Sequence, residues 1–464
     1  MAREIVAPGL PTGTRDFMPE QVAQRRRIVD KVIGVYKLFG FVPLETPILE
    51  RKEVLTGNNP DFRMEIFEIE QKSARINIVD GDEEAKPLAL RFDLTVPLSR
   101  FIAMRKDQLP MPFKRYQLGP VFRGEKVQKG RYRQFDQLDA DIVGSDSVMA
   151  DMEVIAMIYN VMIALGIEDF LVRVNTRKIL NALPFYAGFD QSKIVTVLRI
   201  LDKLDKIGLD GVATELAKEP DDQFDTRYPD LKPQAIARLM DFIAIKGNPD
   251  SVIGQLFNLM STVPQAKDGL DELAAIADGM PASGIDPNRW TLEPSIVRGL
   301  EYYTGPVFET VLTSLPGFGS VFSGGRFDDL IGSFIGYDIP ATGASIGVDR
   351  LFAALEELNV LKEQRVSPDV MICMRPEVDR VKGLEIATML RQAGISAELY
   401  LGQEKRLGAQ IGLASNNKTP FVIILGPDEI EAGKASLKEL SSGQQETLDK
   451  SEICSKIQEK LNIM

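Results

Sequence analysis

Hydrophobic and polar positions follow two different periods in the first third of the chain. Residues Gln21–Phe39 place valine, isoleucine and tyrosine near helical spacing, and Gly40 follows, so this pattern predicts an amphipathic helix. The segments Lys114–Arg123 and Arg133–Val143 are instead typical of strands, and a polar loop at Gly124–Gly130 separates them. Together the two segments predict an antiparallel hairpin.

Two further segments are expected to be extended. Leu88–Leu98 has the composition of a strand, as does Phe41–Leu49. Pro43 and Pro47 lack a backbone N–H, so the second segment is expected at a sheet edge or an interface.

The middle of the chain changes to helical periodicity. Residues from Arg177 to Pro287 show it, with Ile194–Leu204 and Ile236–Ile245 as examples, and we expect an inserted helical domain there. Strand-like sequence then returns at Pro294–Val311, Phe318–Ser323 and Ala341–Val348, and a helix is expected at Asp349–Leu358.

The last part of the chain alternates short apolar runs with helical stretches, which predicts a small parallel or mixed sheet. The runs are Val370–Met374, Ala397–Leu401 and Phe421–Leu425, and the helices are expected at Val381–Ala393 and Gly408–Asn416. With a linker at Gln364–Pro368, the predicted organisation is a core in two parts (1–176 and 288–363), a helical insertion (177–287) and a C-terminal α/β domain (369–464).

The composition of the chain limits the kinds of functional site that it can contain. The formal net charge is −12, yet the stretch from Phe113 to Gln134 holds seven basic residues and one acid. The chain contains no histidine and only two cysteines, Cys373 and Cys454. These counts exclude a histidine general base, a histidine or cysteine metal site and a disulfide framework. With no signal peptide expected at Met1–Pro11 and no long apolar span, a cytoplasmic protein without membrane association is expected.

Four motifs carry candidate chemistry. Arginines suit phosphate groups, because a guanidinium is planar and always charged. The motifs are, in this order, Phe122–Glu125 with Gly130–Phe135, Gly343–Arg350, Arg298–Gly305 and Ser323–Asp328. Taken alone, the first also fits a charged sheet surface and the second a glycine-containing strand. The last two fit a structural arginine–acid pair equally well.

These motifs resemble the histidyl-tRNA synthetase family of class II aminoacyl-tRNA synthetases. Phe122–Phe135 is similar to motif 2 and Gly343–Arg350 to motif 3, while the helix from Gln21 followed by Pro47 resembles the dimer-forming motif 1. Arg298–Tyr303 and Ser323–Asp328 resemble the two signatures of the histidine-specific family. Thr12–Asp16 is similar to its N-terminal opening, and Asp428–Ser436 to its anticodon-binding domain.

The resemblance implies an α+β fold: an antiparallel catalytic core with a helical insertion and a C-terminal α/β anticodon-binding domain. It implies ligation of L-histidine to its tRNA through a histidyl-adenylate, with ATP as substrate, Mg²⁺ on the outer phosphates and a homodimer as the assembly. By matched positions, Arg298 and Arg123 are expected to act at the α-phosphate, and Glu125, Arg131 and Arg350 also to bind ATP.

The same resemblance implies an amino acid pocket. Asp93, Thr95 and Gln137 are expected at the α-ammonium, and Asp141, Tyr302 and Tyr303 at the imidazole end. Some family members have glutamate where this chain has Asp93 and Asp141. The tRNA acceptor end is expected at Lys126, Gln128 and Lys129, where Lys126–Gln128 departs from the Arg-Pro-Gln of many relatives.

Other interpretations remain open on the sequence. The main one is the synthetase-like regulatory subunit of ATP phosphoribosyltransferase, which usually lacks the C-terminal unit. Another is a class II synthetase for threonine, proline or glycine, against which Arg298–Tyr303 argues. A tRNA-binding protein without catalysis is the weakest, because the net charge favours no non-specific binding to nucleic acid.

Overall fold

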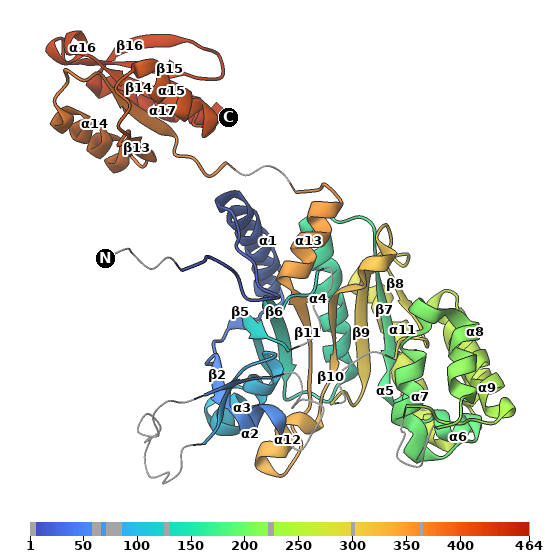
Figure 1. Ribbon diagram of the computed structural model, residues 1–464. Coiled ribbons are helices and arrows are strands. Elements are labelled where there is room, and N and C mark those ends of the chain that lie inside the picture. Colours follow the sequence, from blue (N-terminus) through green and yellow to red (C-terminus); the bar gives the residue numbers. More distant parts are fainter. Residues whose placement is uncertain are drawn as a thin grey trace. The chain divides into compact units, whose positions relative to one another are not determined.

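The computed structural model describes residues 6–57, 66–70, 86–124, 130–220, 227–297, 302–361 and 365–463. The chain divides into two compact units: Met1–Phe17 with Arg25–Leu361, and Met18–Gln24 with Lys362–Met464. The first unit contains the sheet that carries the candidate site (Figure 1).

An eight-stranded sheet is the centre of the first unit, as far as it is described. Its order is β1-β5-β6-β11-β10-β9-β7-β8; β1–β5 and β7–β8 pair in parallel and the other neighbours are antiparallel. The strands are β1 Val42–Pro43, β5 Phe113–Phe122, β6 Gln134–Val143, β11 Ala341–Gly347, β10 Ser320–Arg326, β9 Pro306–Leu312, β7 Phe170–Thr176 and β8 Trp290–Leu292. The predicted β5–β6 hairpin and the edge position of the Pro43 segment are confirmed.

One face of this sheet is covered by helices. Strand β6 turns Leu138, Ala140 and Ile142 into a hydrophobic cluster shared with helices α1 (Pro19–Leu38), α4 (Val148–Leu165) and α13 (Val348–Glu357). Because side chains alternate along a strand, the neighbouring polar residues of β6 face the other side. Helices α3 (Thr95–Arg105) and α12 (Asp329–Ile335) cover part of that second face around Val143, and the polar residues beside them are available for the site.

Helix α4 is strongly apolar because it lies in this core. Ser147 begins the helix, accepting a hydrogen bond from the Met149 N–H, and Gly166 ends it with a φ of 77° that favours glycine. Among the described helices it alone has the length and composition to cross a membrane, but half of that span is buried inside the protein. Its apolar side chains are therefore accounted for by core packing.

The prediction of a strand over Leu88–Leu98 is wrong beyond Leu90. Strand β4 is Leu88–Leu90, and helix α3 occupies Thr95–Arg105. Asp93 Oδ1 accepts a hydrogen bond from the Val96 N–H at 3.1 Å, which satisfies a donor that a helix start leaves free. Strand β4 lies between β2 (Leu49–Arg51) and β3 (Phe67–Ile69) in a separate three-stranded sheet, beside helices α2 (Lys52–Thr56) and α12 (Asp329–Ile335).

The predicted strand over Pro294–Val311 is also too long. Only Pro306–Leu312 forms β9, and the described residues 293–297 and 302–305 lie outside strands. Pro294 lacks a backbone N–H donor, and Gly305 lies directly against the Arg326 side chain, so neither described end of this segment suits strand pairing.

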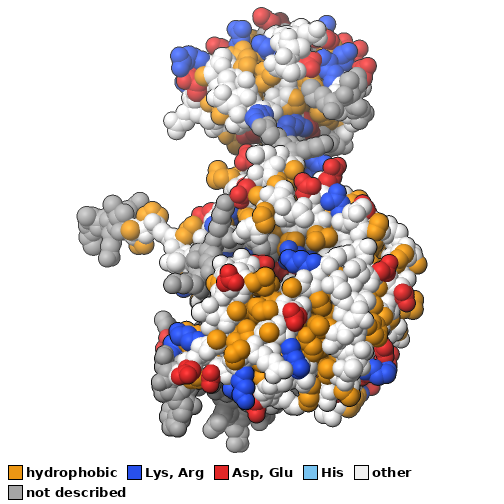
Figure 2. All heavy atoms as spheres, turned by 90° about the vertical axis from the view of Figure 1, so that its right-hand side faces the viewer, with side chains coloured by type: hydrophobic (Ala, Val, Ile, Leu, Met, Phe, Trp, Pro, Cys, Tyr) orange, Lys and Arg blue, Asp and Glu red, His pale blue; other side chains and the backbone are white. Residues whose placement is uncertain are grey.

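The described part of the region from Arg177 to Pro287 is mainly helical, as expected. Its helices are α5 Arg177–Asn181, α6 Leu183–Ala187, α7 Ile194–Leu201, α8 Leu204–Ala217, α9 Pro233–Ile243, α10 Pro249–Met260 and α11 Lys267–Gly279. Their buried side chains join the cluster of the main sheet, so the region shares one core with it. Hydrophobic side chains are visible on this side of the molecule (Figure 2), and the exposed ones of the region include Phe185, Val195, Ile207 and Leu209.

The second unit has a mixed five-stranded sheet in its described part, with order β13-β12-β14-β15-β16. The three strands predicted from sequence pair in parallel, and an antiparallel pair that the sequence analysis did not anticipate extends them. The elements are β12 Val370–Met374, α14 Arg380–Gln392, β13 Ala397–Leu399, α15 Leu407–Asn416, β14 Phe421–Leu425, α16 Pro427–Glu431, β15 Lys434–Glu439, β16 Gln445–Asp449 and α17 Lys450–Ile463. The predicted α+β fold is confirmed, while the exact domain boundaries stay predictions.

Candidate active site

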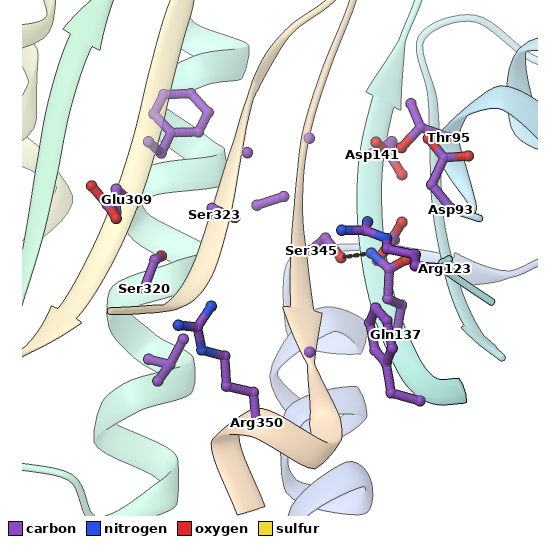
Figure 3. Close-up of a pocket in the computed structure, with 18 of the residues that line it drawn as sticks. Asp93, Thr95, Arg123, Gln137, Asp141, Glu309, Ser320, Ser323, Ser345 and Arg350 are labelled. Atoms are coloured by element: carbon purple, nitrogen blue, oxygen red, sulfur yellow. Dashed lines mark hydrogen bonds between the residues drawn. The ribbon is translucent and has the colours of Figure 1, made fainter. Parts of the chain in front are cut away.

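A cavity of about 350 Å³ lies on this second face of the eight-stranded sheet (Figure 3). This volume is within the range of small-molecule sites. Strands β6, β11, β10 and β9 and the residues around the start of α3 form its walls. The structure brings together nine residues that the sequence predicted for the site: Asp93, Thr95, Arg123, Arg131, Gln137, Asp141, Tyr302, Tyr303 and Arg350.

Five other predicted residues lie outside the described residues. They are Arg298, Glu125, Lys126, Gln128 and Lys129. Their assignments stay predictions.

The cavity has two chemically different sides. In Figure 3, Asp93, Thr95 and Asp141 lie together on one side, and Ser320 and Glu309 lie across β11 and β10 on the other. Arg350, on the first turn of α13, extends toward the second side and donates to the Phe318 carbonyl oxygen. The first side is therefore rich in carboxylates, while the second combines the positive charge of Arg350 with the single carboxylate of Glu309.

On the acidic side, Asp141 is held by a buried arginine. Arg115 is completely buried, and its Nη2 lies 2.6 Å from Asp141 Oδ2. Burial raises the pKa of Asp141 to about 7, although the Arg115 charge acts in the opposite direction. Asp93 is also fully buried, and burial raises its pKa to about 7.

Two adjacent tyrosines close this side of the cavity. The Tyr302 and Tyr303 rings meet edge to face with centroids 5.0 Å apart, and Tyr302 hydrogen-bonds to Thr95. Burial, followed by neighbouring acidic groups, raises the pKa of both phenols above the usual range. Both phenols therefore keep their protons, and their hydroxyls also hydrogen-bond to each other.

Arg123 lies on the acidic side of the cavity, near Gln137 and Asp141 (Figure 3). Its Nε donates to the Phe92 carbonyl oxygen at 3.0 Å, and its guanidinium lies over the Phe135 ring at 5.4 Å. These contacts fix the guanidinium at the cavity wall, where a fixed positive charge can stabilise a developing negative charge without reorganisation.

The sequence analysis missed Asp139 as a site residue. It lies on β6 between Gln137 and Asp141, lines the cavity and is 2% exposed. Positions 137, 139 and 141 have the spacing of two that places side chains on one face of a strand. Applied to the predicted strand, that rule would have found Asp139, and its cross-strand partner Ser345 was missed with it.

The arginine of the Ser323–Asp328 motif, Arg326, has a structural role. Arg326 does not line the cavity; its Nε and Nη2 contact Asp151 Oδ2 at 3.1 and 2.5 Å, and its remaining bonds go to backbone and Asp328. Of the two interpretations that the sequence left even, the structural arginine–acid pair therefore describes Arg326. The motif's Ser323, Gly324 and Phe327 do line the cavity.

The N-terminal opening supports the far side of the cavity wall. Asp349 lies 3.0 Å from Arg25 and 3.7 Å from Arg15, and it accepts from the Asp136 N–H at 2.8 Å. The Arg15 guanidinium lies over the Phe17 ring at 4.1 Å. These contacts connect the first turn of α13, which carries Arg350, to β6 and to the chain's start.

The buried acids predict an unusual pH dependence of stability. Burial raises the pKa of Asp93 and Asp141 to about 7 and that of Asp151 to about 6. The folded state therefore holds more protons than the unfolded chain between about pH 4 and 7, and stability falls as pH rises through this window. No histidine is present to titrate there.

We expect the free energy of unfolding to be lower at pH 7.5 than at pH 5.5. Urea unfolding followed by fluorescence measures it, because the single tryptophan, Trp290, is buried in the same unit. Asp93→Asn is expected to flatten the dependence. A stability that rises between these two pH values would contradict the prediction.

Comparisons with known proteins cover almost the whole chain. A family model described as histidyl-tRNA synthetase matches residues 13–351, and one described as anticodon binding domain matches residues 371–460. A histidine–tRNA ligase of Dinoroseobacter shibae is 39% identical over 94% of this chain and 90% of its own length. That of Helicobacter acinonychis is 38% identical over 95% and 96%.

A solved structure shows the same likeness. The histidyl-tRNA synthetase of Nostoc sp. PCC 7120 is 33% identical, with a TM-score of 0.80, and the likeness covers 98% of this chain and all of that one. The antiparallel sheet with its two-sided cavity, joined to an anticodon-binding unit, is that of a class II aminoacyl-tRNA synthetase. Within this class, the chain belongs to the histidyl-tRNA synthetase family.

Proposed function

We propose that this chain ligates L-histidine to its tRNA, with ATP as the second substrate and histidyl-adenylate as the intermediate. The relatives that are 38–39% identical are named histidine–tRNA ligases. The observation that carries the proposal is the two-sided cavity, which offers carboxylates to an amino acid and arginines to a nucleotide. The anticodon-binding unit and the relatives' names disfavour a regulatory subunit.

In the first step, a carboxylate oxygen of histidine attacks the α-phosphorus of ATP, and the bond to the β-phosphate breaks to release pyrophosphate. Arg123 and Arg298 stabilise the charge that grows on the α-phosphate, and Arg350 binds the γ-phosphate. Glu125 and Arg131 hold the rest of the nucleotide. Support comes from Arg123 and Arg350, whose side chains reach the cavity from opposite walls.

The histidine side chain lies at the acidic side in this proposal. Asp141 accepts from one imidazole nitrogen, and the Tyr303 hydroxyl, beside Tyr302, faces the other. A buried polar group left unmatched is costly, so this pair selects imidazole over isosteres. Asp93, Thr95 and Gln137 bind the α-ammonium. The Arg115 contact supports the proposal, because it prevents Asp141 from turning away.

In the second step, the 3′-hydroxyl of the terminal adenosine attacks the acyl carbon, and AMP leaves. The described residues that line the cavity include no histidine, lysine or cysteine, so we propose that a phosphate oxygen of the adenylate takes the proton. Lys126, Gln128 and Lys129 approach the acceptor end of the tRNA.

Magnesium is proposed to arrive with ATP. In the described part of the chain, no three acidic or cysteine side chains converge as a metal site. Glu309 is an acidic side chain on the side toward which Arg350 extends, and it fits a single contact to an ion held by the outer phosphates. Such an ion neutralises phosphate charge.

A homodimer is also proposed, with the cytoplasm as the location. Exposed hydrophobic side chains occur on β1 and on or next to the small three-stranded sheet. Both follow helix α1 in the chain, and α1 with Pro47 resembles the dimer-forming motif 1. Exposed apolar side chains in one part of a protein favour an interaction surface there. The side chains are Val42, Ile48, Leu49, Phe67 and Ile69.

ATP–pyrophosphate exchange tests the proposed function. We expect exchange that depends on histidine and on no other amino acid, and a loss of it in Arg298→Ala. Charging of tRNA by the wild-type chain completes the test. Absence of exchange from folded protein, with and without added tRNA, would contradict the proposal and favour a regulatory subunit.

A further inference from the structure

Apart from Asp141 Oδ2, which forms the ion pair with Arg115, three buried side-chain oxygens of cavity-lining residues have no hydrogen-bond donor among the described residues. They are Asp93 Oδ2, Gln137 Oε1 and Asp139 Oδ1. Their side chains are 2%, 6% and 2% exposed, and all three line the cavity. Buried acceptors are almost always satisfied, so a bound ligand is expected to supply the donors.

The remaining contacts of these groups fix which atoms face the ligand. The Ser345 hydroxyl hydrogen-bonds to the Asp139 carboxylate and accepts from Gln137 Nε2 at 2.6 Å (Figure 3). Ser345 donates its hydroxyl proton to Asp139, so it can only accept a hydrogen bond from Gln137. The amino group of Gln137 therefore points to Ser345, which leaves its carbonyl oxygen for the ligand. Asp93 Oδ1 accepts a hydrogen bond from the Val96 N–H, so Oδ2 is the oxygen that remains for the ligand.

An ammonium group is the complement of this arrangement, because it has three donors and no acceptor. We propose that Asp139 binds the α-ammonium of histidine as its third acceptor, beside Asp93 and Gln137. It takes the place there of Thr95, whose hydroxyl hydrogen-bonds to Tyr302. The cation would also compensate the charge of two carboxylates that are buried close to Asp141. This inference rests on the proposed function and adds Asp139 to the residues that contact the amino acid.

Calorimetric binding of two ligands to Asp139→Asn tests the assignment. The ligands are L-histidine and 3-(imidazol-4-yl)propionate, which keeps the imidazole and carboxylate but lacks the amino group. We expect the affinity for histidine to fall about 10- to 100-fold, as for a lost hydrogen bond to a charged group, and the affinity for the analogue to stay nearly constant. Asp139→Ala should show the same contrast.

Asp136→Asn is the matched control on the same strand. Its side chain pairs with Arg25 and does not line the cavity, so both affinities should remain within about twofold of wild type. Asp139→Asn should stay folded in the Trp290 unfolding assay, because it removes a buried charge.

Two results would overturn the inference. One is unchanged histidine affinity in Asp139→Asn. The other is an equal loss for both ligands, which would mean that Asp139 acts on the imidazole or only positions Asp141. A wild-type chain that binds no histidine would instead contradict the proposed function itself.

Discussion

Replacement of Arg326 by methionine is expected to lower the stability of the first unit by about 3–5 kcal/mol, as for removal of one partner of a buried ion pair. Arg326 is 3% exposed and Asp151 is completely buried. The substitution leaves Asp151 without its charged partner, and it also removes the bonds to the Ser145 and Ser147 carbonyl oxygens. Urea unfolding followed by Trp290 fluorescence reports on this unit.

Two further variants make the result specific. Lys267→Met removes a surface ion pair, with Lys267 73% and Asp271 56% exposed, and should change stability by less than about 1 kcal/mol. The double variant Arg326→Met/Asp151→Leu should regain much of the loss, because no buried charge is left unpaired. Equal effects of Arg326→Met and Lys267→Met would show that the buried pair adds no stability.

Strands and helices with regular periodicity were predictable from the sequence. The β5–β6 hairpin follows from two extended runs around a polar loop, and α1 follows from its helical spacing. The start of α3 was not predictable from periodicity, because the Asp93 side chain, rather than an apolar pattern, stabilises the helix start. Local hydrogen bonding of this kind overrides a composition that is typical of strands.

The site was predictable to the extent that its residues lie in motifs. Arg123, Arg350 and Tyr303 each belong to one, and all three line the cavity. Arg326 belongs to a motif as well, but its partner Asp151 comes from a helix 175 residues away in sequence. Pairing at that separation depends on tertiary packing, so no local pattern could distinguish its structural role from a binding role.

Replacement of Gly343 by alanine is expected to reduce histidine-dependent exchange by about 100-fold or more, the scale of a misplacement of about 1 Å at a reacting centre. Gly343 lies opposite Asp141 in the β6–β11 pairing. A Cβ there would lie 2.1 Å from Asp141 Oδ1 and 2.7 Å from the Ala140 carbonyl oxygen. The carboxylate cannot simply rotate away, because Arg115 holds it at 2.6 Å.

The structure therefore has to displace either Asp141 or strand β11, and both carry cavity residues. We expect the loss mainly in the KM for histidine, because the arginines proposed to bind ATP lie outside the contact. Gly254→Ala, in the middle of α10 with nothing within 4 Å of the added Cβ, is the matched control and should retain wild-type exchange. Wild-type exchange by a folded Gly343→Ala variant would contradict the proposed role of Asp141 in histidine binding.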